Sequence, residues 1–75
     1  MQTTIIKTIG TNIHALRKSH GMTQGELAVR LGVTPQAVSK WERGQCAPDI
    51  AFFPSLATLF GVAIDTLFSY CKNQL

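Results

Sequence analysis

Residues 23–44 read TQGELAVRLGVTPQAVSKWERG, and this stretch contains two helix starts. Thr23 can cap the first helix, and Glu26 three residues later completes a capping box. Thr34 can cap the second helix, and Pro35 follows at the first helical position, where its missing N–H costs no hydrogen bond. The stretch therefore predicts two helices in close succession, at about residues 24–31 and 35–42.

The connection between these helices consists of residues 32–34 alone. Gly32 can adopt a positive φ there, so the short turn forces a large angle between the helices. Elsewhere apolar residues recur at intervals of three and four, and no segment alternates long enough to form a strand. The sequence predicts an all-α fold of five short helices, at about residues 4–19, 24–31, 35–42, 50–60 and 64–70.

The second of the two helices has a polar side with no obvious partner inside the domain. Val38 and Trp41 lie three apart on its apolar side. Gln36, Ser39 and Lys40 share the opposite stripe. Glutamine can pair with adenine, lysine with guanine, and serine with either base. An ordinary solvated surface also carries such groups, so on these residues alone both interpretations stay open.

Length and charge narrow the class of protein. The 75 residues with a net charge of +3 form one domain, 1–75, with a core at about residues 5–70. Residues 1–46 carry a formal charge of +4, and residues 47–75 carry −1. A basic half beside a nearly neutral half suits a polyanionic partner, although it also fits an ordinary charged surface.

Several other classes are not indicated. The N-terminus contains neither a signal peptide nor a membrane span. Cys46 and Cys71 form no CxxC pair, which favours reduced thiols in a cytoplasmic protein. With His14 and His20 they match no zinc spacing, and no catalytic or phosphate-loop motif occurs. We expect neither an enzyme nor a metal or cofactor site.

With these features established, residues 24–43 resemble the helix-turn-helix of the phage repressor and Cro/C1-like family, often called XRE. The shared positions are Gln24, Leu27, Ala28, Leu31, Gly32, Val33, Val38, Trp41 and the ending Glu42–Arg43–Gly44. IGTNIHALRKSHGMTQ, residues 9–24, is similar to the family's first helix, and PDIAFFPSLATLFGVAIDTLF, residues 48–68, to its fourth and fifth. The resemblance implies a compact, lambda-repressor-like five-helix domain. It also implies sequence-specific binding of double-stranded DNA by a transcriptional regulator of the repressor type.

The resemblance implies roles for individual residues. Those expected to contact base edges in the major groove are Pro35, Gln36, Ser39 and Lys40. Pro35 departs from the usual polar residue and can offer only apolar contact, such as to a thymine methyl group. Those expected to contact phosphates are Gln24, which also braces the recognition helix, Arg43, the Gly44 backbone and Lys18. Arg17 and Glu42 are expected to form a structural salt bridge between the first helix and the end of the third.

The C-terminal half has more large apolar residues than one helix face can bury. The residues expected in the core are Phe53, Leu56, Phe60, Val62, Ile64 and Leu67. Those left as a candidate dimer interface are Phe52, Phe68 and Tyr70. Burial under the C-terminal tail is the alternative for these three. Pro54 either distorts a helix that starts near residue 50 or marks a restart of that helix.

The expected partners are double-stranded DNA and a second copy of the chain in a homodimer, with no membrane and no small-molecule effector. The chain fits a stand-alone regulator, such as a phage repressor, an antitoxin or a restriction controller, and equally the N-terminal part of a longer protein. The alternative function is a protein-interaction module, an antitoxin or adaptor that uses the C-terminal apolar surface. Binding that weakens steeply with salt would favour DNA over this alternative.

Overall fold

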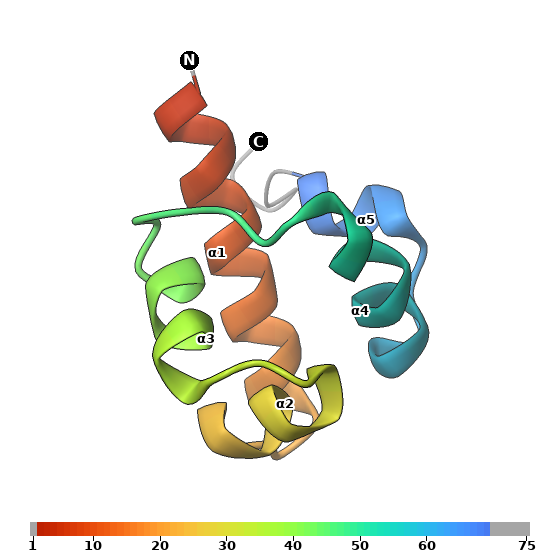
Figure 1. Ribbon diagram of the computed structural model, residues 1–75. Helices are drawn as coiled ribbons and strands as arrows, with labels where there is room; N and C mark the ends of the chain where they lie inside the picture. Colours follow the sequence, from red (N-terminus) through yellow and green to blue (C-terminus); the bar gives the residue numbers. More distant parts are fainter. Residues whose placement is uncertain (1, 70–75) are drawn as a thin grey trace.

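The structure is a computed structural model that describes residues 2–69 of the chain. Its elements are α1 (Gln2–Ser19), α2 (Gln24–Leu31), α3 (Pro35–Glu42), the 3₁₀ helix η1 (Ile50–Phe52), α4 (Phe53–Phe60) and α5 (Ile64–Phe68). Helix α1 runs through the middle of the domain, with α3 on one side and α4 and α5 on the other (Figure 1). The predicted all-α fold of five helices is confirmed.

The two helix starts in residues 23–44 form as the capping residues predict. The Thr23 backbone N–H donates to Glu26 Oε1 at 2.8 Å, and the Glu26 N–H donates to Thr23 Oγ1 at 3.0 Å. At the next start the Ala37 N–H donates to Thr34 Oγ1 at 3.1 Å. Gly32 ends α2 with a φ of +74°, a left-handed conformation that favours glycine. These local interactions fix the angle between α2 and α3.

The core lies where α1 meets the other helices. Its buried apolar residues are Ile9, Ile13, Leu27, Ala28, Val38, Trp41, Phe53, Leu56, Phe60 and Leu67. The prediction that Ile64 belongs to this core is wrong, since its side chain is 41% exposed. Helix α5 spans only five residues and buries Leu67 alone, so Ile64 at its first position stays at the surface.

Helix α1 approaches α3 at a glycine. A Cβ atom on Gly10 would lie 2.0 Å from the carbonyl oxygen of Trp41, which is far below any real contact distance. A side chain at this position would push the two helices apart. Gly10 therefore sets how deeply α3 sits against α1, and so positions the exposed side of α3.

The segment around Pro54 is a restart. Residues 50–52 form η1, and α4 begins at Phe53 with Pro54 in its first turn, where the ring is tolerated. Phe52 ends η1 partly buried, and its ring centroid lies 5.8 Å from that of Trp41. The expectation that Phe52 forms part of an exposed patch is therefore wrong, because the restart turns its ring toward the core.

Candidate nucleic-acid interface

Helix α3 has one buried side and one exposed side. Val38 is fully buried and Trp41 is 5% exposed, and together they attach the helix to the core. The residues expected to contact bases lie on the other side: Pro35, Gln36 and Lys40 are exposed and Ser39 is half-buried. The stripe of amide, hydroxyl and ammonium groups therefore projects away from the domain, in the arrangement that a helix needs to enter a DNA groove.

Glu42, at the C-terminal end of α3, is the centre of a buried polar network. Arg17 on α1 donates through Nε to Glu42 Oε2 at 2.6 Å and through a terminal nitrogen to Oε1 at 3.1 Å. Gln24, the first residue of α2, donates through Nε2 to Oε1 at 3.0 Å. A second terminal nitrogen of Arg17 donates to the carbonyl of Met22 at 2.7 Å. One carboxylate thus joins α1, α2 and α3, and it holds α3 at a fixed angle.

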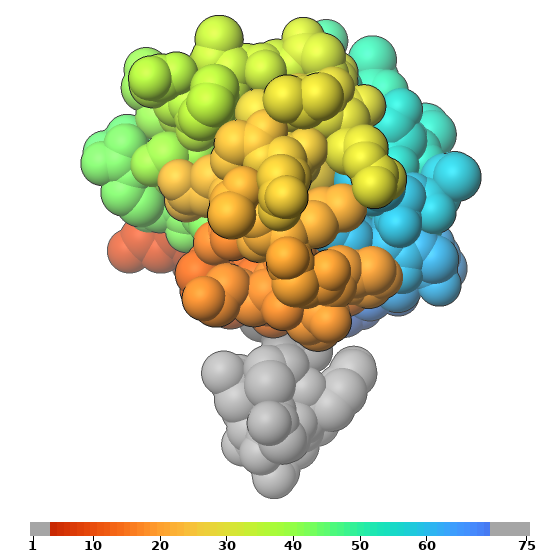
Figure 2. All heavy atoms as spheres, turned by 90° about the horizontal axis from the view of Figure 1, so that it is seen from below, coloured from red at the N-terminus to blue at the C-terminus, as the bar shows by residue number. Residues whose placement is uncertain are grey.

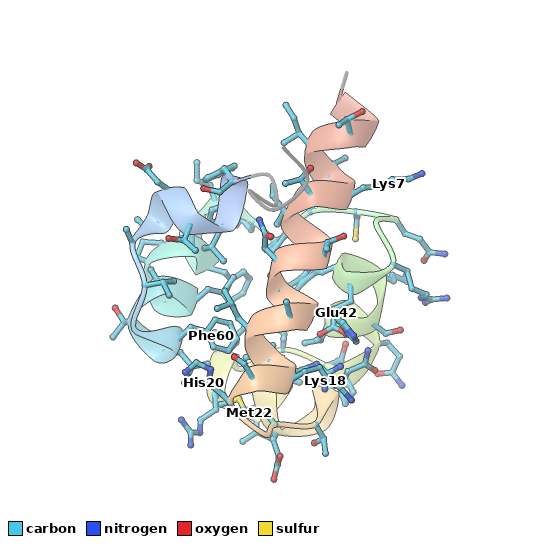
Figure 3. The ribbon with its side chains drawn as sticks, turned by 180° about the vertical axis from the view of Figure 1, so that it is seen from behind. Lys7, Lys18, His20, Met22, Glu42 and Phe60 are labelled. Carbon is cyan, nitrogen blue, oxygen red and sulfur yellow. The ribbon has the colours of Figure 1, made fainter. Side chains whose placement is uncertain are left out.

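His14 is a member of this network that the sequence does not indicate. Its Nδ1 lies 3.0 Å from Glu42 Oε1 and 3.2 Å from a terminal nitrogen of Arg17. The sequence raises His14 only as a metal ligand. Its position one turn before Arg17 on the same helix was the available signal. Figure 3 shows Glu42 on the side of α1 where this network forms.

The environment of Glu42 keeps it ionised. Burial raises the pKa of the carboxyl group, but hydrogen bonds from Arg17, Gln24 and His14 outweigh that effect and leave the pKa below its usual value. The side chain of Glu42 is only 4% exposed and that of Arg17 9%, so the pair is shielded from solvent. A carboxylate held this way can brace α3 throughout the neutral pH range.

The residues expected to contact phosphates differ in whether their hydrogen-bond donors are already used within the domain. Lys18 and Arg43 are exposed, although Arg43 Nε also donates to the Ser39 carbonyl at 3.3 Å. The Gln24 amide is tied to Glu42 through its nitrogen, which accounts for its bracing role. The Gly44 N–H, which was expected to contact a phosphate, donates to the Trp41 carbonyl at 3.1 Å and closes the end of α3; a phosphate contact by this backbone stays a prediction. Gly44 is also required for its φ of +75°.

The C-terminal apolar residues are only partly exposed. Phe68 is 43% exposed, and its ring centroid lies 5.1 Å from the ring centroid of buried Phe53. Ile64, on the same short helix, and Ile50, in η1, are 41% and 78% exposed. Three residues form the candidate interface predicted from the sequence. Phe68 is exposed, whereas Phe52 is partly buried against the core. Tyr70 lies outside the described residues.

Residues 2–69 contain neither a grouped set of metal ligands nor a membrane-spanning helix. No three His, Cys, Asp or Glu side chains in this range are grouped closely enough to hold a metal ion. None of the described helices is long and apolar enough to cross a membrane.

The family follows from comparison with known proteins. The model of the helix-turn-helix family HTH_3 matches residues 13–67. The chain belongs to this helix-turn-helix family. Its members are DNA-binding transcription regulators, and DNA-binding transcription regulation is the function of this domain.

Individual relatives give the same assignment. Over 55 residues, 73% of the chain, it is 45% identical to the 26 kDa repressor protein of Escherichia phage HK022, and it spans 23% of that protein. It is 32% identical over 65 residues to an uncharacterized HTH-type transcriptional regulator of Archaeoglobus fulgidus, in an alignment that covers 87% of the chain and 93% of the relative. The solved restriction-modification controller protein C.AhdI of Aeromonas hydrophila superposes with a TM-score of 0.75 at 28% identity. That superposition covers 84% of this chain and 96% of the controller.

Proposed function

We propose that the domain binds specific double-stranded DNA sequences by inserting the exposed side of α3 into the major groove, and that it regulates transcription there as a repressor. The observation that carries this proposal is the orientation of α3. Its apolar side is buried, its end is held by Glu42, and Gln36, Ser39 and Lys40 project outward. Because the helix is already fixed, binding does not have to pay the entropic cost of ordering it, and this favours binding.

The polar stripe supports a division of labour between residues. Gln36 can form two hydrogen bonds with adenine, and Lys40 can donate to guanine O6 and N7. Ser39 is half-buried and reaches a shorter distance, so we assign it a single hydrogen bond at the centre of the contact. Pro35 contributes apolar contact at the start of the helix. Phosphate contacts from Arg43 and Lys18 hold the helix in register but do not select a sequence.

A homodimer is the form that we propose for binding. Two copies related by a two-fold axis would place their α3 helices in two half-sites about 34 Å apart, one helical turn of DNA. The exposed side chains of Phe68 and Ile64 on α5 supply an apolar surface for this contact. The proposal places the protein in the cytoplasm with its DNA. We assign it no small-molecule effector.

The test of sequence-specific binding is selection from a pool of randomised duplexes with the wild-type chain. We expect an enriched motif with two-fold symmetry and loss of that motif in a protein with Gln36→Ala and Lys40→Ala combined. Uniform recovery of all sequences would overturn specific recognition. Dimerisation is tested by sedimentation of the wild-type chain and of Phe68→Ser, which we expect to shift the protein toward the monomer.

The same exposed apolar side chains favour a second candidate, a protein-interaction module that binds another protein through α5. Salt separates the two. DNA binding through phosphates weakens steeply as salt rises, whereas contact between apolar surfaces does not. Failure to retain any duplex even at low salt would favour the second candidate.

A further inference from the structure

Lys7, near the start of α1, has no role predicted from the sequence, yet the structure places it at the end of the recognition helix. A Cβ atom on Gly44 would lie 2.8 Å from Lys7 Cγ, 3.4 Å from its Cα and 3.6 Å from its Cβ. The aliphatic stem of Lys7 therefore lies directly on the backbone of Gly44. This contact holds a lysine against the turn that follows α3.

From this contact we propose that Lys7 binds a DNA backbone phosphate at the C-terminal end of α3. This inference rests on the proposed major-groove binding by α3. The Gly44 N–H donates to Trp41 and the next N–H, that of Gln45, donates to the Lys40 carbonyl. Both amides point into the end of the helix, so the turn needs another donor to bind an anion.

The charge of Lys7 is available for this role. Both ion pairs in residues 2–69 are made by Glu42, so no described carboxylate lies within 4.0 Å of the Lys7 ammonium group. The side chain is exposed and extends outward from α1 in Figure 3. Arg43, the residue before Gly44 in the chain, is also exposed. Exposed cations at the end of α3 attract a phosphate group.

The geometry of α1 places Lys7 on the correct side. Gly10 packs on the Trp41 carbonyl, and His14 contacts Glu42, so these positions define the side of α1 that faces α3. Lys7 lies about one turn before Gly10 on this side, and Lys18 lies one turn after His14. At 1.5 Å per residue the two lysines are about 16 Å apart along α1. Lys7 and Lys18 therefore lie near opposite ends of the side of α1 that faces α3, so each can contact a separate phosphate.

The other faces of the domain offer weaker features. Shallow hollows between α2 and α4 are lined by Met22, Val29, Arg30, Pro54 and Leu59. Figure 2 shows the surface near α2, with no deep cleft in it. Arg30 borders both hollows, on the side of α2 that faces α4 rather than α3. It therefore serves as a control for a basic residue remote from the proposed contact.

The test measures how the Kd for DNA depends on salt. The variants are Lys7→Met, which keeps the stem on Gly44 but removes the charge, Lys7→Arg, which keeps the charge, and Arg30→Met as the matched control. The probes are the duplex most enriched by the wild-type chain and a duplex of random sequence, titrated between about 50 and 200 mM salt. Because one phosphate contact contributes about 0.9 to the slope of log K against log salt, we expect Lys7→Met to lower that slope by about 0.9 on both duplexes.

Lys7→Arg and Arg30→Met should keep the wild-type slope. An unchanged slope for Lys7→Met would overturn the proposal. An equal loss in Arg30→Met would also overturn it, since the effect would then come from total charge. A loss in Lys7→Arg equal to that in Lys7→Met would show that a positive charge at this position does not preserve the contact, which again contradicts it. If the wild-type chain binds neither duplex, it is the proposed function that fails, and this result is distinct from the others.

Discussion

Arg17 Nε donates to Glu42 Oε2 at 2.6 Å, and this bond joins the middle helix of the domain to the end of its recognition helix. Both side chains are almost completely shielded from water. The folded protein is strongly destabilised when a buried charge loses its partner, because that charge is then left unpaired away from water. The orientation of α3 therefore depends on a buried ion pair rather than on the exposed side chains proposed to contact bases.

Removal of one member of this pair should destabilise the fold. We expect Glu42→Ala to lower the free energy of unfolding by about 3–5 kcal/mol, because Arg17 would be left buried and unpaired. Lys40→Ala, on the exposed side of the same helix, should change it by about 0.5 kcal/mol or less. Thermal melting of the two variants measures the difference. Similar shifts in the two melting temperatures would contradict the structural role of the pair.

The same carboxylate makes stability depend on pH. The pKa of Glu42 is lowered in the folded state from its ordinary value of 4.5, so the unfolded chain takes up the proton first as the pH falls. The contribution of Glu42 is complete above that ordinary value and is lost as the pH falls from there through the lowered pKa. Urea unfolding at a series of acidic pH values should show this decline. Glu42→Gln should give a flatter curve over the same interval, and parallel curves for the two proteins would count against the assignment.

Gly10 and Gly25 provide a test of the close approach between α1 and α3. Alanine is favoured over glycine inside a helix by about 1 kcal/mol. Gly25→Ala should show this gain, since its nearest neighbour would be Thr23 Oγ1 at 3.8 Å. Gly10→Ala should instead lose about 1–3 kcal/mol, because the new methyl group would overlap the Trp41 carbonyl. Melting temperatures that rise in both variants would show that the two helices can separate without cost.

The features that the sequence predicted correctly are those encoded locally. Thr23 with Glu26, and Thr34 with Pro35, define two helix starts through residues three or fewer positions apart. Gly32 ends α2 for a reason that concerns its own backbone alone. The angle between α2 and α3 follows from these local signals, and the exposed stripe on α3 follows from the angle. The base contacts assigned to that stripe stay predictions.

What the sequence did not predict depends on packing between distant segments. The Gly44 amide is used within the end of α3, and Lys7 lies on Gly44 although the two are far apart in the chain. Phe52 and Ile64 were assigned to the wrong environments because apolar spacing does not say where a short helix ends or which of its residues face inward. His14 joins the Glu42 network only because α1 and α3 are close.

A further interaction of this kind connects α1 to α5. Asn12 Nδ2 lies 3.2, 2.8 and 2.8 Å from the carbonyl oxygens of Thr66, Leu67 and Ser69, at the end of α5. Asn12→Ala should leave these carbonyls without their donor and cost about 1–3 kcal/mol of unfolding free energy. Ser19→Ala, which removes an exposed hydroxyl bonded to its own helix, is the control and should cost about 0.5 kcal/mol or less. Equal melting temperatures for the two variants would show that α5 is held by apolar contacts alone.

Residues on and after α3 should divide the recognition of DNA between base selection and phosphate binding. Gln36→Ala and Lys40→Ala should each relax the preference at one or two base pairs, by about 1–3 kcal/mol, while other positions keep their selectivity. Arg43→Ala should weaken binding to all duplexes about equally, because a phosphate contact carries no sequence information. Binding of each variant to a panel of single-base variants of the selected duplex measures both effects. If Arg43→Ala instead altered the preference at one base pair, its side chain would have to reach into the groove, and its assignment to a phosphate would be wrong.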